Sequence, residues 1–201
     1  MWGIINDAGW PIWPLILTSV LCVSVILERS LALRASSIIP KDLMFNLESQ
    51  LKKGLIIKEE LDQLSANSLS GYMMASVIRN QGKSLEVMEN TIIKAGESIS
   101  YKLEKHLHIL SLISTVAPLL GLFGTIVGMV ELFSSFTSTG QDVKVFAKGI
   151  SIALYNTAGG IVVAIPAMVS YRIFRAKIDE YVHVMEEHAG RIADLINSGR
   201  E

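Results

Sequence analysis

Three long stretches without a charged side chain constrain this sequence more than any other feature. They are Ala8–Leu27, Ile109–Val130 and Gly149–Tyr171. A helix of about 20 residues crosses the ~30 Å hydrocarbon core of a bilayer, so each stretch is long enough to span it. Buried helices of soluble proteins rarely reach this length without a charge. The sequence therefore predicts an all-α integral membrane protein with three transmembrane helices.

The composition agrees with this class and excludes others. Of the 201 residues, 50% are hydrophobic and 18% are charged, and the formal net charge is −1. Because this balance leaves no basic footprint, we expect no nucleic-acid partner. His106 and His108 lie on different faces of a helix and make a poor metal pair, and the single cysteine is Cys22. We expect neither a metal nor a cofactor, and no enzyme activity, because no catalytic constellation or nucleotide-binding glycine loop is evident.

Basic residues near the helix ends indicate the orientation, since cytoplasmic flanks carry an excess of Lys and Arg. One side of the predicted bundle has nine such residues: Arg29, Arg34, Lys41, Lys94, Lys102, Lys105, Arg172, Arg175 and Lys177. The other side has only Lys144 and Lys148, and all three tryptophans lie at that end of the first stretch. We therefore expect the N-terminus to face outwards and the C-terminus to face the cytoplasm, with membrane lipid around the spans.

The predicted organisation follows from these assignments. It comprises an outward N-terminus with the first transmembrane helix (1–28), a cytoplasmic helical region (29–108), the second transmembrane helix (109–133), an outward loop (134–148), the third transmembrane helix (149–171) and a cytoplasmic C-terminal helix (172–201).

Apolar residues recur at helical spacing on the cytoplasmic side of two of the spans. The first stripe predicts one unbroken helix from Ser84, which can cap it, to about Phe133, or ~75 Å at 1.5 Å per residue. The second stripe continues the third helix to Ile196. Two transmembrane helices are thus expected to extend as long helices into the cytoplasm. A shorter helix from Pro40 to Gly54 and a polar turn at Ser65–Ser70 are also predicted.

Small residues mark the faces on which the second and third spans pack, because close approach drives helix association in lipid. Gly121, Gly124 and Gly128 recur on the second span, and Gly160 lies on the third. Pro118 and Pro166 are candidate kinks.

Polar side chains on these faces allow two interpretations. Thr115, Thr125, Asn156 and Thr157 either bond to their own helix and to neighbouring helices, or line a partly hydrated pathway. The span interiors contain no Asp, Glu, Lys, Arg or His, although proton pumps ordinarily use such a group as a relay. If the protein conducts protons, a partner helix must supply the carboxylate.

Two segments carry a resemblance to a known family. Residues 117–129 (APLLGLFGTIVGM) resemble the second-span motif of the MotA/TolQ/ExbB proton channel family. Residues 149–160 (GISIALYNTAGG), followed by 163–167 (VAIPA), resemble its third-span motif. Residues 13–17 (WPLIL) and 27–29 (LER) are similar to the first span of ExbB- and TolQ-like members. The resemblance covers nearly the whole chain in order.

The resemblance implies a bacterial inner-membrane protein, with the outward side facing the periplasm. It implies a homo-oligomer, a pentamer, around an ExbD- or TolR-like single-span partner that carries a membrane Asp. Thr125 and Thr157 match the pore-lining threonines of the family. Proton flow would then drive mechanical work on a TonB- or TolA-like protein.

One position departs from the family pattern, and alternatives stay open. Many members carry Glu where this chain has Ile152, so gating or pore hydration is expected to differ. A non-conducting membrane scaffold is the first alternative. A MotA-type flagellar stator is disfavoured, because the resemblance implies four spans there and this sequence predicts three.

Overall fold

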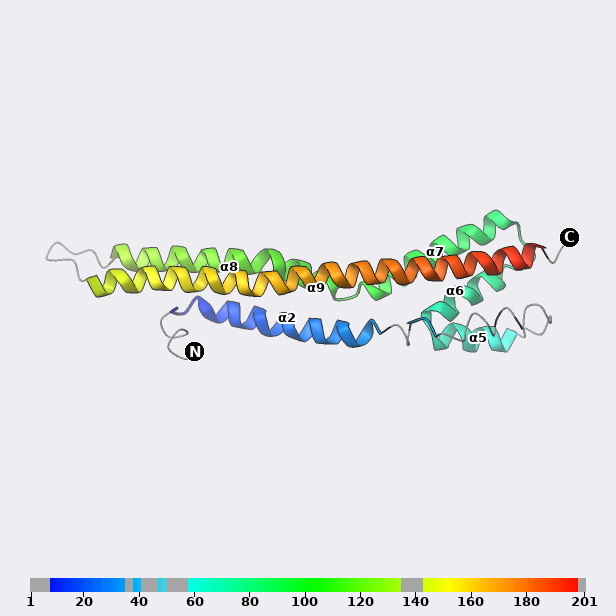
Figure 1. Cartoon of the computed structure of the whole chain (residues 1–201), viewed down its shortest axis with the longest axis horizontal. Coiled ribbons are helices and arrows are strands. Elements are labelled where there is room, and N and C mark those ends of the chain that lie inside the picture. Colours follow the sequence, from blue (N-terminus) through cyan, green and yellow to red (C-terminus); the bar gives the residue numbers. More distant parts are fainter. Residues whose placement is uncertain are drawn as a thin grey trace. The chain divides into compact units, whose positions relative to one another are not determined.

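The computed structural model describes residues 8–34, 38–40, 47, 49, 58–134 and 143–198 of the chain. The predicted all-α class is confirmed, since no strand occurs in these ranges (Figure 1). Three helices are long and apolar enough to cross a membrane, which confirms the predicted number of spans. The helices are α2 (Ile12–Ala32), α5 (Lys58–Asn67), α6 (Leu69–Ile78), α7 (Leu85–Leu103), α8 (Leu107–Ser134) and α9 (Val143–Ser198).

The chain divides into two compact units. The transmembrane unit comprises Met1–Arg29 and His106–Ile173, and the helical unit comprises Ser30–Lys105 and Phe174–Glu201. Most of α2, all of α8 and the first part of α9 belong to the transmembrane unit.

The helix predicted to run without a break from Ser84 to Phe133 is divided in two. Helix α7 ends at Leu103 and α8 begins at Leu107, and His106 between them has a φ of 66°. A residue in the left-handed region departs from the dihedral angles of the α-helix, so the i to i−4 hydrogen-bond ladder is interrupted there. The prediction of one unbroken helix is therefore wrong.

Helix α9, in contrast, is continuous over 56 residues, which is ~84 Å at 1.5 Å per residue. Within the helical unit, its stripe of apolar residues is buried as predicted. The buried positions are Phe174, Ile178, Tyr181, Met185, Ala189, Ile192 and Ile196. The corresponding stripe on α7 is buried at Met88, Ile92, Ala95, Ile99 and Leu103. These two stripes form much of the core of the helical unit.

Local details of the connecting segments differ from the predictions. The polar turn predicted at Ser65–Ser70 is mostly helical, because α5 continues to Asn67 and the hydroxyl of Ser68 accepts a hydrogen bond from the Gly71 amide at 2.9 Å. Ser84 occupies the N-cap position of α7, but its side chain makes no capping hydrogen bond. The helix predicted from Pro40 to Gly54 lies largely outside the described residues.

Candidate functional site

Helices α8 and α9 pack against each other through glycines in the transmembrane unit. A Cβ on Gly121 would lie 2.8 Å from the carbonyl oxygen of Asn156, and one on Gly160 would lie 2.7 Å from that of Ala117. A Cβ on Gly128 would lie 2.8 Å from the carbonyl oxygen of Gly149. Since higher numbers on α8 face lower numbers on α9, the helices are antiparallel (Figure 1). Only glycine permits this approach, because backbone occupies the space of the missing Cβ.

Gly124 faces the side chain of Asn156, whereas the other three glycines face backbone atoms. A Cβ there would overlap the Cβ and carboxamide of Asn156, which is fully buried. The Asn156 Nδ2 donates hydrogen bonds of 2.8 Å to the carbonyl of Ile152, one turn earlier in α9, and to the carbonyl of Ala8. The carboxamide thus joins α9 to the segment before α2, as the helix-bonding interpretation of this residue describes.

The three threonines singled out from the sequence differ in their hydrogen bonds. The Thr115 hydroxyl donates to the Ser111 carbonyl at 3.2 Å, and the Thr125 hydroxyl donates to the Leu122 carbonyl at 2.6 Å. Both bonds lie within α8, and they are the pattern expected for threonine in a membrane helix. The Oγ1 of Thr157 is buried and has no hydrogen-bond partner among the described residues. Its hydroxyl is therefore an unsatisfied polar group within the described part of the transmembrane unit.

The structure pairs Thr157 with Gly121 and not directly with Thr125. The Thr157 Cα lies 3.2 Å from the position of a Cβ on Gly121. Thr125 lies four residues further along α8, about 6 Å by the helical rise. The two candidate pore threonines are therefore on the facing helices and about one turn apart.

Both prolines lie inside continuous helices, Pro118 in α8 and Pro166 in α9. Each removes the amide that would bond to the carbonyl four residues earlier, at Ser114 and Val162 respectively. These two carbonyls are the backbone acceptors that the prolines release within the spans.

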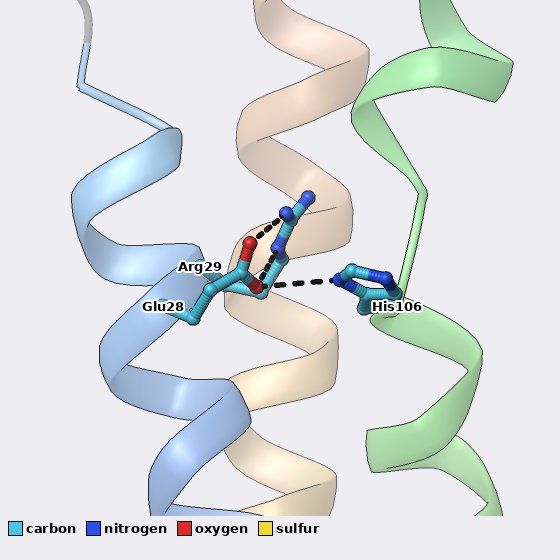
Figure 2. Close-up of polar contacts among 3 residues, drawn as sticks. All are labelled: Glu28, Arg29 and His106. Atoms are coloured by element: carbon cyan, nitrogen blue, oxygen red, sulfur yellow. Dashed lines mark hydrogen bonds and ion pairs between the residues drawn. The ribbon is translucent and has the colours of Figure 1, made fainter.

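One end of the transmembrane unit carries a charged cluster, which Figure 2 shows. The Arg29 Nε donates to the Glu28 Oε2 at 2.6 Å, and the His106 Nδ1 lies 3.7 Å from the same oxygen. The Arg29 side chain is buried, whereas those of Glu28 and His106 are partly exposed. The sequence predicted Glu28 and Arg29 as a membrane boundary, but it gave no signal for His106, which is 78 positions away from Glu28. Among the described residues, no group of three or more His, Cys, Asp or Glu could hold a metal ion.

The comparison with known proteins agrees with the resemblance. The profile of the MotA/TolQ/ExbB proton channel family matches residues 55–187. The chain therefore belongs to the MotA/TolQ/ExbB proton channel family, and it is a multi-pass membrane protein with three candidate spans.

Individual relatives are named as biopolymer transport proteins. Biopolymer transport protein exbB1 of Vibrio cholerae is 27% identical over 188 residues, which cover 90% of this chain and 82% of the relative. Biopolymer transport protein ExbB of Pseudomonas putida is 28% identical over 163 residues, 74% of this chain but only 49% of that relative. A putative ExbB-like protein of Helicobacter pylori is 47% identical over a shorter match of 71 residues, 35% of this chain and 38% of the relative.

Proposed function

We propose that this chain is the multi-copy subunit of an inner-membrane proton channel that converts the proton gradient into mechanical work. The protein would act as an ExbB/TolQ-like subunit and serve a TonB- or TolA-like partner that crosses the periplasm. It would make no covalent change to any substrate, so it is not proposed to be an enzyme. Membership of the MotA/TolQ/ExbB family and the names of the relatives support this proposal.

The observation that carries the proposal is the absence of charged and histidine side chains from the interiors of the spans on α8 and α9. No Asp, Glu, Lys, Arg or His lies between His108 and Glu131 on α8, or between Lys148 and Arg172 on α9. An ion that crosses lipid needs such a group or a water-filled path. A partner helix with a membrane Asp, of the ExbD/TolR type, would supply the carboxylate, and a ring of copies of this chain would enclose it.

Thr157 is the proposed contact point between this chain and that carboxylate. Among the described residues its buried hydroxyl has no hydrogen-bond partner, and in the assembled complex it would become accessible and donate to a carboxylate or to water. Thr125 would line the same pathway from α8, with Thr115 and Asn156 as supporting polar groups. The N-terminus is proposed to face the periplasm and the C-terminus the cytoplasm, as the distribution of Lys and Arg indicates.

The test is purification of the tagged chain from its native membrane in mild detergent, followed by mass spectrometry. We expect a homo-oligomer, and with it a small protein that has one transmembrane helix and a single Asp within it. A partner-free homo-oligomer would leave the chain without a proton carrier and would count against the proposal. The periplasmic domain of the partner would then distinguish a TonB-type from a Tol-type system.

A non-conducting scaffold remains the second candidate, and one observation favours it. Ile152 is apolar and buried at a position where, by resemblance, many members carry Glu. The two functions differ in their dependence on the proton gradient. An uncoupler that collapses the gradient should abolish the output of an energiser and leave that of a scaffold unchanged.

A further inference from the structure

The segment just before the first span is irregular yet buried. Residues 8–11 lie outside α2, and Gly9 has a φ of 73°, which turns the chain before the helix begins. Ala8 and Pro11 on either side of this turn are buried in the transmembrane unit. Turns outside regular secondary structure are ordinarily exposed, so the burial of this one requires contacts that hold it in place.

The carbonyls of this segment have distinct partners. Those of Gly9 and Trp10 accept hydrogen bonds from the amides of Ile12 and Trp13, at 3.4 and 3.2 Å. The carbonyl of Ala8 lies too early in the chain for the first turn of α2, and it accepts from Asn156 Nδ2 at 2.8 Å. Asn156 is thus the side chain that satisfies the first buried carbonyl of the described chain.

The burial of both partners makes this bond costly to lose. Ala8 and Asn156 are both 0% exposed in the transmembrane unit. A buried carbonyl that loses its donor is left unsatisfied, and irregular backbone in a membrane protein is tolerated only where protein groups satisfy it. The Ala8 carbonyl therefore depends on Asn156.

The carboxamide has one usable orientation. Both of its close neighbours are carbonyl oxygens, those of Ala8 and Ile152, so the NH₂ group must face them. The absence of a side chain at Gly124 leaves the space that the carboxamide fills. A longer side chain at 156 would meet α8, and a shorter one would not reach Ala8.

Apolar contacts extend the same attachment. The side chain of Ile152 lies 3.9 Å from the position of a Cβ on Gly9. The rings of Trp10 and Phe123 meet edge to face with centroids 5.8 Å apart, which joins the segment to α8. The segment thus contacts α8 and α9 together.

We propose that Asn156 fastens the segment Ala8–Pro11, and with it the start of the first span, to the α8–α9 pair. We call this attachment the latch. The latch consists of the Asn156 carboxamide, the Ala8 carbonyl that it holds and the Gly124 site that accommodates it. Loss of the donor frees the turn at Gly9 while leaving the glycine contacts between α8 and α9 in place. This inference is independent of proton conduction, since every group in it belongs to the single chain.

Hydrogen–deuterium exchange of the full-length purified chain tests the latch. In Asn156→Val the amides of residues 8–13, among which Pro11 has none, should exchange about three- to twentyfold faster than in the parent, the range that corresponds to one interhelical hydrogen bond in a membrane protein. The hydrogen-bonded amides of Ile12 and Trp13 are the main readout. The amides of α8 should keep their protection. The neighbouring variant Thr157→Val is the matched control and should leave residues 8–13 unchanged, because the Thr157 hydroxyl has no hydrogen bond to lose among the described residues.

Equal exchange of residues 8–13 in Asn156→Val and the parent would overturn the latch. If Asn156→Val also removes the protection of α8, then Asn156→Ala is used as the test variant instead. The alanine methyl group occupies the position of the Asn156 Cβ and adds no atom that could disturb α8. Loss of protection throughout the transmembrane unit in both variants would overturn the proposal too, since it would show a residue needed for the whole fold and not for one segment.

Discussion

At the scale of single residues, two positions carry conformations or contacts that a substitution can isolate. His106 has a φ of 66° between α7 and α8, and Ile152 is 2% exposed between the N-terminal segment and α8. The first is set by backbone geometry and the second by the space around a side chain. Each can be tested by comparing two substitutions at the same position.

His106 should prefer glycine over alanine. Both His106→Gly and His106→Ala lose the contact with Glu28. The side chains of His106 and Glu28 are 42% and 46% exposed, so this contact contributes at most about 1 kcal/mol to stability. Alanine still has a Cβ, so the left-handed backbone conformation costs it about 1 kcal/mol or more, whereas glycine avoids this cost. We expect the glycine variant to be more stable by about 1 kcal/mol, read as a higher melting temperature in detergent.

The control for this prediction is Glu97, an exposed residue inside α7. There the order should reverse, with alanine more stable than glycine by about 1 kcal/mol, because glycine is a poor helix former. The same order at both positions would contradict a left-handed break at His106.

Ile152 should not accept glutamate, the residue that the family resemblance leads one to expect at this position. Its Cγ2 lies 3.2 Å from the position of a Cβ on Gly128, and the side chain is 2% exposed. Ile152→Val should cost about 0.5–1.5 kcal/mol, the usual range for this truncation. Ile152→Glu should cost at least twice as much, because it buries a polar group without a partner. Thermal unfolding of the two purified variants measures this, and equal losses would show that the site is open to water.

At the scale of helices, the α8–α9 contact rests on individual glycines. Gly160→Ala should weaken it strongly, by about 2 kcal/mol or more, because the new Cβ would meet the backbone of Ala117 at 2.7 Å. Gly159→Ala should be tolerated, since its Cβ would meet nothing closer than 3.7 Å. Gly190→Ala, with no atom within 4 Å, should stabilise α9 by up to about 1 kcal/mol. Melting temperatures of the three variants give the order, and a tolerated Gly160→Ala would contradict the packing.

The helices show what a sequence can predict and why it stops. Charge-free stretches and apolar stripes are local properties, so the three spans and the unbroken course of α9 could be predicted. The break at His106 could not, because neither proline nor glycine marks it and the stripe continues from Leu103 to Leu110. The bond from Asn156 to Ala8 joins positions 148 residues apart, and no local pattern encodes such a pairing.

At the scale of the whole molecule, the transmembrane unit lacks the chemistry that the proposed function requires. The described spans contain satisfied threonines, glycine contacts and one threonine hydroxyl without a described partner, but no Asp, Glu, Lys, Arg or His in their interiors. Under the proposed function, a carboxylate of another chain completes the proton path. A substitution can then act on the fold of one chain or on the assembled complex, and the two effects can be measured separately.

Thr157→Val separates the two most clearly. Valine has nearly the shape of threonine, and it removes a buried hydroxyl that has no hydrogen-bond partner among the described residues. The variant should therefore be as stable as the parent, or more stable by up to about 1 kcal/mol, since a buried unpaired polar group is unfavourable.

In the complex, the same change removes the proposed donor to the partner carboxylate. Proton uptake by vesicles that hold the purified complex should then fall at least tenfold while the oligomer stays intact. Thr18→Val on α2 is the control and should leave uptake unchanged, because that hydroxyl bonds to the Pro14 carbonyl of its own helix at 2.7 Å and is not part of the proposed pathway. Full proton uptake by Thr157→Val would show that the hydroxyl is not on the pathway, and loss of the oligomer would show that it serves assembly instead.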